Sequence, residues 1–362
     1  MIPRWLWRAA WLLVPAGWAV HRFTHDDALT FAICCLSLVP LARTMGHATE
    51  ELAERLGPAA GSLLNASFGN AAELIIGISA LRHGHLALVK GSLTGSILGN
   101  HLLVAGASIV VGGVRVSRLR FNRLAASSSV STLFLAVVAM VVPTLLSLGK
   151  NPRYRPALLS IEISAVLITM YALSLFFALR THRTQLGGRA PLLATPAEAA
   201  AEAQPEAVPR HSVWLDVGKL VLSAGATAIS SELLVAALDG TLTTLHLPET
   251  FVGVIIVAIV GNAAEHSTAL IFARRGEMDV ALGIAWESSK QIALFVAPVL
   301  VFAGLLIGAP MDLAFTRFEV IALGLAVMAL SLIALDGETH WLEGAFLLAT
   351  YVVLGMGFYF VG

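Results

Sequence analysis

The 362-residue chain is 57% hydrophobic and only 13% charged, which excludes an ordinary soluble protein and indicates an integral membrane protein. Its 23 basic and 23 acidic side chains leave no net charge, so nothing points to nucleic acid as a partner. The only cysteines, Cys34 and Cys35, are neighbours in an apolar segment, which excludes a disulfide framework and a cysteine metal motif.

Eleven stretches are apolar and long enough to cross a membrane as helices, which takes about 20 residues. Arg4 and Arg8 in the first stretch could also belong to a signal peptide, but no Ala-x-Ala cleavage site follows, so we expect a retained helix. The predicted spans are 5–21, 28–44, 58–82, 86–112, 124–148, 157–180, 213–238, 249–273, 279–308, 315–335 and 341–361.

Basic residues in the connections between spans predict the orientation. If the N-terminus is cytoplasmic, fifteen Lys and Arg residues lie on the cytoplasmic side and seven on the other. We therefore expect an integral protein of the cell (inner) membrane with its N-terminus in the cytoplasm.

Two connections are acidic. The one between the second and third spans carries Glu50, Glu51 and Glu54, and we interpret it as a solvated turn; a mouth that attracts cations is the alternative. The long connection, 181–211, has four prolines around Glu198, Glu202 and Glu206. Because prolines limit a helix to a few turns, we interpret it as a solvated cytoplasmic linker, with a regulatory acidic helix as the alternative.

The pentapeptide Gly-Asn-Ala-Ala-Glu occurs twice, at 69–73 and 261–265, each time inside an apolar run. An ionisable residue at the bilayer centre costs roughly 2.5–3.5 kcal/mol on insertion scales, so such a residue marks a candidate functional site. Glu73 and Glu265 could instead only hydrogen-bond helices together. Their occurrence in two identical motifs favours one shared binding site.

The sequence offset that aligns the two pentapeptides also pairs Ser96 with Ser288 and Pro40 with Glu232. The repeat therefore extends beyond the motif. Five crossings separate equivalent helices, and because five is odd the copies are inverted. We therefore predict an all-α polytopic protein of eleven transmembrane helices, with the site near the midplane between two inverted five-helix repeats. The predicted parts are an extra helix at 1–27, a first repeat at 28–180, the linker at 181–211 and a second repeat at 212–362.

Polar residues near the two acids suggest the ligand. Asn70 and Asn262 lie three residues before the glutamates and so share their helical faces. The next helix of each repeat adds Ser96, Asn100, Ser288 and Gln291. Oxygen ligands suit a hard cation such as Ca²⁺, whose charge two carboxylates balance. In the empty site, repulsion between the buried carboxylates favours protons, so competition for one site would give exchange.

Other polar residues are candidates for the ion pathway. Glu232 lies inside the seventh span and is interpreted either as a proton-pathway residue or as an acid that bonds helices. His266 follows Glu265 and could relay protons. Its direction on a helix differs by about 100° from that of Glu265, which favours a packing or hydrogen-bonding role.

On these residues the chain resembles the Ca²⁺/H⁺ exchangers of the cation/proton exchanger family, within the Ca²⁺/cation antiporter superfamily. The resemblance implies that Glu73 and Glu265 hold calcium and protons alternately, so that a proton gradient drives calcium out of the cytosol by alternating access. It implies a secondary transporter without a cofactor, with Ca²⁺ and H⁺ as substrates and the lipid bilayer as its surroundings; a homo-oligomer is left open. The matching motifs are at 65–74, 95–100, 260–266 and 291–298, with further runs at 311–319 and 336–344.

Two features depart from the family pattern. Where the family has Gly-Ser-Ser-x-Gln, residues 287–291 read Glu-Ser-Ser-Lys-Gln. Glu287 and Lys290 are three apart on one face; they either neutralise each other or alter ion selectivity or proton coupling. His101 stands where an apolar residue is usual.

Three other functions compete with calcium/proton exchange. The same fold could exchange sodium, potassium or manganese. An intramembrane enzyme could use the two glutamates as acid and base, although the chain lacks a His-Glu-x-x-His or Gly-x-Ser-x-Gly motif. A passive cation channel would carry calcium without countertransport of protons.

Overall fold

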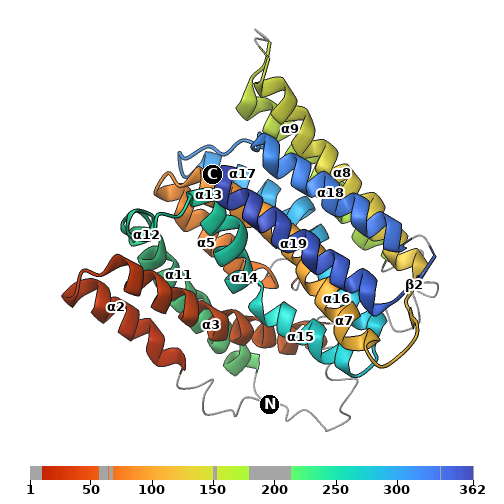
Figure 1. Cartoon of the computed structure of the whole chain (residues 1–362). Coiled ribbons are helices and arrows are strands. Elements are labelled where there is room, and N and C mark those ends of the chain that lie inside the picture. The colour runs from red at the N-terminus through yellow and green to blue at the C-terminus, as the bar shows by residue number, and fades with distance from the viewer. Residues whose placement is uncertain are drawn as a thin grey trace. The chain divides into compact units, whose positions relative to one another are not determined.

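The computed structural model describes residues 10–56, 64, 68–149, 153–178, 213–334 and 336–361. These residues are mostly helical (Figure 1). The predicted linker at 181–211, the start of the predicted third span and residues 65–67 of its motif lie outside them. The chain divides into two compact units, one formed by Met1–Ser92 with Ala207–Ala264 and the other by Leu93–Glu206 with Glu265–Val361. Each unit thus takes segments from both halves of the sequence.

The first unit consists of helices and short helical segments, several of them broken. Helix α12 ends at His246, whose φ of 54° is left-handed, and the segment that follows bends away by 109°. In chain order the elements are η1 (Ala10–Leu12), α2 (Leu13–Phe23), α3 (Asp27–Leu56), α5 (Ala71–Arg82), the first half of α6 (Leu86–Leu98), α11 (Val213–Ala236), α12 (Leu238–Leu245), α13 (Glu249–Phe251), the π-helical η4 (Val252–Val257) and α14 (Ala258–Gly261).

Helix α3 runs for 30 residues and corrects one prediction. Glu50, Glu51 and Glu54 lie in its last turns, so the connection read as a solvated turn is helical, and Glu50 is buried. The reason is an apolar stripe: Met45, Ala48 and Leu52 recur at helical spacing and pack against Leu220 of α11 and against Ala71 and Ala72 of α5. Charged residues at the end of a span were taken for a loop, but tertiary packing continues the helix.

The second unit is also helical and contains one short strand pair, in which Leu119 pairs with Thr339. Helices α7 and α19 cross closely at two glycines, since a Cβ on Gly106 would stand 2.8 Å from the carbonyl oxygen of Gly344. The elements are the π-helical η2 (Gly99–Val104), α7 (Ala105–Gly113), β1 (Leu119–Arg120), α8 (Arg123–Ser147), α9 (Pro156–Phe176), α15 (Ala263–Arg274), α16 (Met278–Gln291), the π-helical η5 (Ile292–Val296), α17 (Ala297–Leu306), α18 (Arg317–Ala334), β2 (Glu338–Thr339) and α19 (Trp341–Val361).

Several of these helices suit a lipid bilayer. In the part of the chain that the structure describes, seven continuous helices are long and apolar enough to span a membrane, and an eighth span results if the bent pair from Leu238 to Gly261 counts as one. Large apolar side chains such as Trp214, Leu306 and Phe360 are exposed, as expected for surfaces that face lipid. The protein is therefore a helical membrane protein, and the count of eleven spans and the inverted repeat remain predictions.

Candidate cation site

In both pentapeptides a helix begins directly after the asparagine. Asn70 precedes α5 with φ −105° and ψ 26°, and Asn262 separates α14 from α15 with φ −92° and ψ 8°. These angles lie between the helical and extended regions, so the helical hydrogen-bond ladder is broken there. Two segments far apart in the sequence therefore adopt the same local backbone.

Each glutamate is the third residue of the helix that follows the break, Glu73 in α5 and Glu265 in α15. At that position the first N–H groups and the positive end of the helix dipole favour a negative charge. Broken helices of this kind supply the ion sites of many secondary transporters, because helix termini inside a bilayer leave backbone groups available to an ion. Each carboxylate thus lies in the first turn of its helix, at the positive end of the helix dipole.

In the first unit, Glu73 lies against the second pentapeptide. A Cβ built on Gly261 would be 3.3 Å from Oε1 of Glu73, so the carboxylate approaches the α-carbon of the glycine. Asn70 and Asn262 are both buried, and Asn262 donates from Nδ2 to the carbonyl of Ala258 at 2.9 Å. Glu265 is the first residue of the C-terminal segment of the second unit, so the two glutamates belong to different units.

In the second unit, the structure brings three predicted residues together. Asn100, in η2, donates from Nδ2 to Oγ of Ser288 at 3.0 Å, and its Oδ1 lies 3.2 Å from Nε2 of His266. Because an amide oxygen only accepts, this contact places the imidazole proton on Nε2. His266, next to Glu265, thus donates a hydrogen bond that links α15 to η2, and Asn100 extends the link to α16.

The π-helical segments lie beside these residues. Segment η2 begins at Gly99 and contains Asn100, and η5 begins directly after Gln291. A π-helical turn widens the backbone and often occurs at functional sites. Ser96 and Gln291 are both buried within one turn of these segments. The four supporting residues of the fourth and ninth predicted spans therefore all lie next to a distorted helix.

The departures from the family pattern are also buried in the second unit. Lys290 Nζ lies 2.6 Å from Oε2 of Glu287, one turn away on the same helix. His101 has its Nδ1 2.8 Å from the carbonyl of Ile97 and 2.9 Å from Oγ of Ser289. Both departures thus have polar partners within the unit.

Glu232, in α11, contacts the end of α5 that is opposite to Glu73. Its carboxylate pairs with Arg82 at 3.2 Å and with His83 at 3.5 Å, and its side chain is 40% exposed. Arg82 is nine residues after Glu73, or about 13 Å further along the helix. This geometry corresponds to the interpretation of Glu232 as an acid that bonds helices, here α11 to α5.

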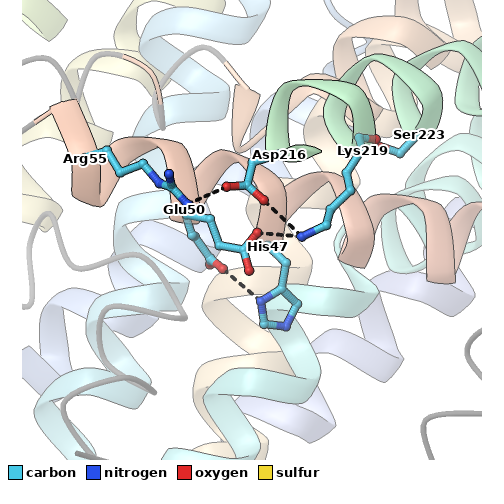
Figure 2. Close-up of polar contacts among 7 residues, drawn as sticks. His47, Glu50, Arg55, Asp216, Lys219 and Ser223 are labelled. Atoms are coloured by element: carbon cyan, nitrogen blue, oxygen red, sulfur yellow. Dashed lines mark hydrogen bonds and ion pairs between the residues drawn. The ribbon is translucent and has the colours of Figure 1, made fainter. Parts of the chain in front are cut away.

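An ionic network that the sequence analysis did not identify joins α3 and α11 (Figure 2). Asp216 is fully buried. Its carboxylate lies 2.9 Å from Nη2 of Arg55 and 3.0 Å from Nζ of Lys219. Nζ of Lys219 also lies 2.9 Å from Oε2 of Glu51. Close by on α3, His47 lies 3.4 Å from Glu50. The spacing of Asp216 and Lys219 at the start of a span was the only sequence signal, and their partners come from a distant segment.

Among the described residues, no group of three or more His, Cys, Asp and Glu side chains is arranged to hold a metal ion. Each unit contributes one motif carboxylate, Glu73 in the first and Glu265 in the second. Carboxylate, amide and hydroxyl oxygens are the donors that a hard cation such as Ca²⁺ prefers.

Comparison with known proteins gives matches along the whole chain. The profile of the family described as sodium/calcium exchanger protein matches residues 27–180 and 216–360. The Ca(2+)/H(+) antiporter ChaA of Bacillus subtilis (strain 168) is 43% identical, over 97% of this chain and 99% of the relative. The Ca(2+)/H(+) antiporter of Aphanothece halophytica is 41% identical, over 96% and 95%.

Solved structures have the same fold. A structure described as native YfkE superposes with a TM-score of 0.79 at 38% identity, covering 97% of this chain and 100% of that one. The structure described as the H+/Ca2+ exchanger CAX gives a TM-score of 0.72 at 15% identity, covering 99% and 92%. The second likeness shows the fold alone.

Proposed function

Because the chain belongs to the sodium/calcium exchanger protein family, as its motifs predicted, we propose that it is a Ca²⁺/H⁺ antiporter. Relatives that match it over nearly their full length are named as antiporters for these two ions. The chain is accordingly a secondary transporter and not an enzyme. In this proposal Ca²⁺ is the bound substrate and no cofactor takes part.

The observation that carries the proposal is the shared geometry of the two motifs. In each, a helix begins directly after the asparagine, and the glutamate lies in its first turn. We propose that Ca²⁺ and protons compete for Glu73 and Glu265 near the midplane, with neutral oxygens completing the shell. These oxygens come from Asn70, Asn262, Ser96, Asn100, Ser288 and Gln291.

Competition for shared carboxylates explains exchange. A calcium ion needs both carboxylates deprotonated, so its binding releases protons, and reprotonation releases calcium. If the inverted repeats expose the site to one side of the membrane at a time, each ion must leave before the other binds. A proton gradient then drives calcium out of the cytosol. The excess of basic residues supports a cytoplasmic N-terminus in the cell membrane.

Calcium uptake by proteoliposomes of the purified protein tests this function. With an acidic lumen, we expect Ca²⁺ to accumulate inside and the lumen to lose protons. Collapse of the pH gradient with an ionophore should stop accumulation. Uptake that is independent of the pH gradient would indicate a passive channel, and dependence on luminal Na⁺, K⁺ or Mn²⁺ in place of luminal protons would indicate another exchange. Either result would overturn the proposal.

A further inference from the structure

Helix α16 carries an ion pair in the interior of the second unit. Nζ of Lys290 and Oε2 of Glu287 are 2.6 Å apart, and the two residues are only 5% and 8% exposed. All residues from 281 to 291 are buried, so water does not screen the pair. Charges in such a place interact strongly with each other and with any ion nearby.

The pair lies on the same helix as two proposed cation ligands. Glu287 is four residues before Gln291, which places both side chains on one face of α16. Ser288 points about 100° away and bonds to Asn100, while Ser289 bonds to His101. A Glu287 side chain released from Lys290 would therefore have Gln291 as its neighbour one turn further on.

A tyrosine of another helix also interacts with Glu287. Tyr171 of α9 is close enough to Glu287 to interact with it electrostatically. Its hydroxyl is buried and has no hydrogen-bond partner among the residues that the structure describes. Within one helical turn, Lys290 is thus the only cation that the structure pairs with Glu287 in the described part of the chain.

Charge count explains why this pairing matters. The affinity of an oxygen site for Ca²⁺ rises with the number of charged ligands, and transport requires that the ion also leaves. A free carboxylate beside Gln291 would add negative charge to the site, whereas a free ammonium would repel the cation. Held together, the two charges cancel.

We propose that Lys290 binds Glu287 in order to keep it from acting as a third carboxylate for the transported cation. The pair is thus a specificity determinant that sets the affinity for Ca²⁺ without contacting it. This inference rests on the proposed function, because it concerns the same site.

The inference predicts opposite effects of two substitutions on the KM for Ca²⁺ in proteoliposomes. Lys290→Gln keeps a hydrogen-bond donor for Glu287 but removes the positive charge, so KM should fall by roughly tenfold and maximal uptake should fall as release slows. Glu287→Gln leaves the ammonium without its counter-charge, so KM should rise by roughly tenfold. The double variant should return KM close to the wild-type value.

A purely structural pair would give a different pattern. Both single variants would then lower the yield or melting temperature of the protein while KM stayed constant. Lys290→Arg, which keeps the positive charge, would retain the stability lost in Lys290→Gln and would also leave KM constant. That result, or shifts of KM in the same direction, would overturn the inference. If Lys290→Gln does not fold, the inference is tested by two results alone: the KM for Ca²⁺ should rise in Glu287→Gln and return to the wild-type value in the double variant.

Two controls separate this inference from the proposed function. Glu338→Gln breaks an exposed pairing with Arg118 and Arg120 and should leave KM unchanged. If the wild-type protein itself carries no calcium against protons, the proposed function fails. If it does so and the two single variants lack opposite shifts, only the inference about Lys290 fails.

Discussion

The carboxylate of Glu73 lies directly against the α-carbon of Gly261, so that a Cβ on the glycine would stand 3.3 Å from Oε1. The acid of the first pentapeptide thus contacts the glycine of the second, although α5 and α14 come from opposite halves of the chain. The glycine leaves the space that the carboxylate occupies. The glycine of one pentapeptide thus makes room for the glutamate of the other.

Replacing Gly261 with alanine should impair transport and leave folding largely intact. The added methyl would force the Glu73 carboxylate to shift by a few tenths of an ångström, and loosely placed ligands bind Ca²⁺ less well. We expect a KM for Ca²⁺ raised by roughly tenfold, given that 1.4 kcal/mol corresponds to that factor. Initial rates of uptake in proteoliposomes measure it. Gly225→Ala on α11 is the control, because nothing lies within 4 Å of its added Cβ; an equal effect there would refute the steric argument.

The hydrogen bond between Asn100 and Ser288 should contribute to stability and to transport. Ser288→Ala leaves the buried amide of Asn100 without this acceptor, which should cost about 1–2 kcal/mol of unfolding free energy. Thermal melting in detergent measures the loss, and uptake assays should show a smaller defect than loss of either motif glutamate. Ser331→Ala is the matched control, since among the described residues its hydroxyl bonds to the carbonyl of Val327 within its own helix. Equal melting temperatures for both variants would contradict this expectation.

The ionic network of α3 and α11 should stabilise the first unit. Asp216→Asn leaves Arg55 and Lys219 without their buried counter-charge (Figure 2). Both cations are about one-third exposed and therefore partly screened, so we expect a loss of about 2 kcal/mol, below the usual cost of a fully buried pair. Arg118→Gln, at an exposed pair, should cost less than about 1 kcal/mol. Denaturation in detergent measures the unfolding free energy of both variants. Similar losses would show that the burial of Asp216 does not make its ion pairs more stabilising than an exposed pair.

Hydropathy was sufficient to locate the helical segments, since each predicted span contains helix in its described part. Membrane helices are apolar on most sides, however, so composition does not say where a helix breaks. The breaks at Asn70 and Asn262 and the π-helical segments η2 and η5 depend on backbone geometry that apolar residues tolerate equally well.

Electrostatic partners on distant helices were not predicted from the sequence. The motifs drew attention to Asn100, Ser288 and His266, which the structure brings into contact, while the ion-binding roles of Glu73 and Glu265 remain predictions. Asp216 and Arg55 were missed because their pairing joins helices that are distant in sequence. Periodicity within one segment carries no information on such a contact, and the charges at the end of α3 were for the same reason assigned to a turn.

The most direct test of the account measures calcium and proton fluxes together in one purified preparation. Wild-type proteoliposomes should take up Ca²⁺ and release protons in a constant ratio. We predict that both fluxes vanish together in Glu73→Gln and in Glu265→Gln, whereas Glu338→Gln retains them. Normal exchange in either glutamine variant, or calcium flux that continues without protons, would contradict the claim that the two ions share these carboxylates.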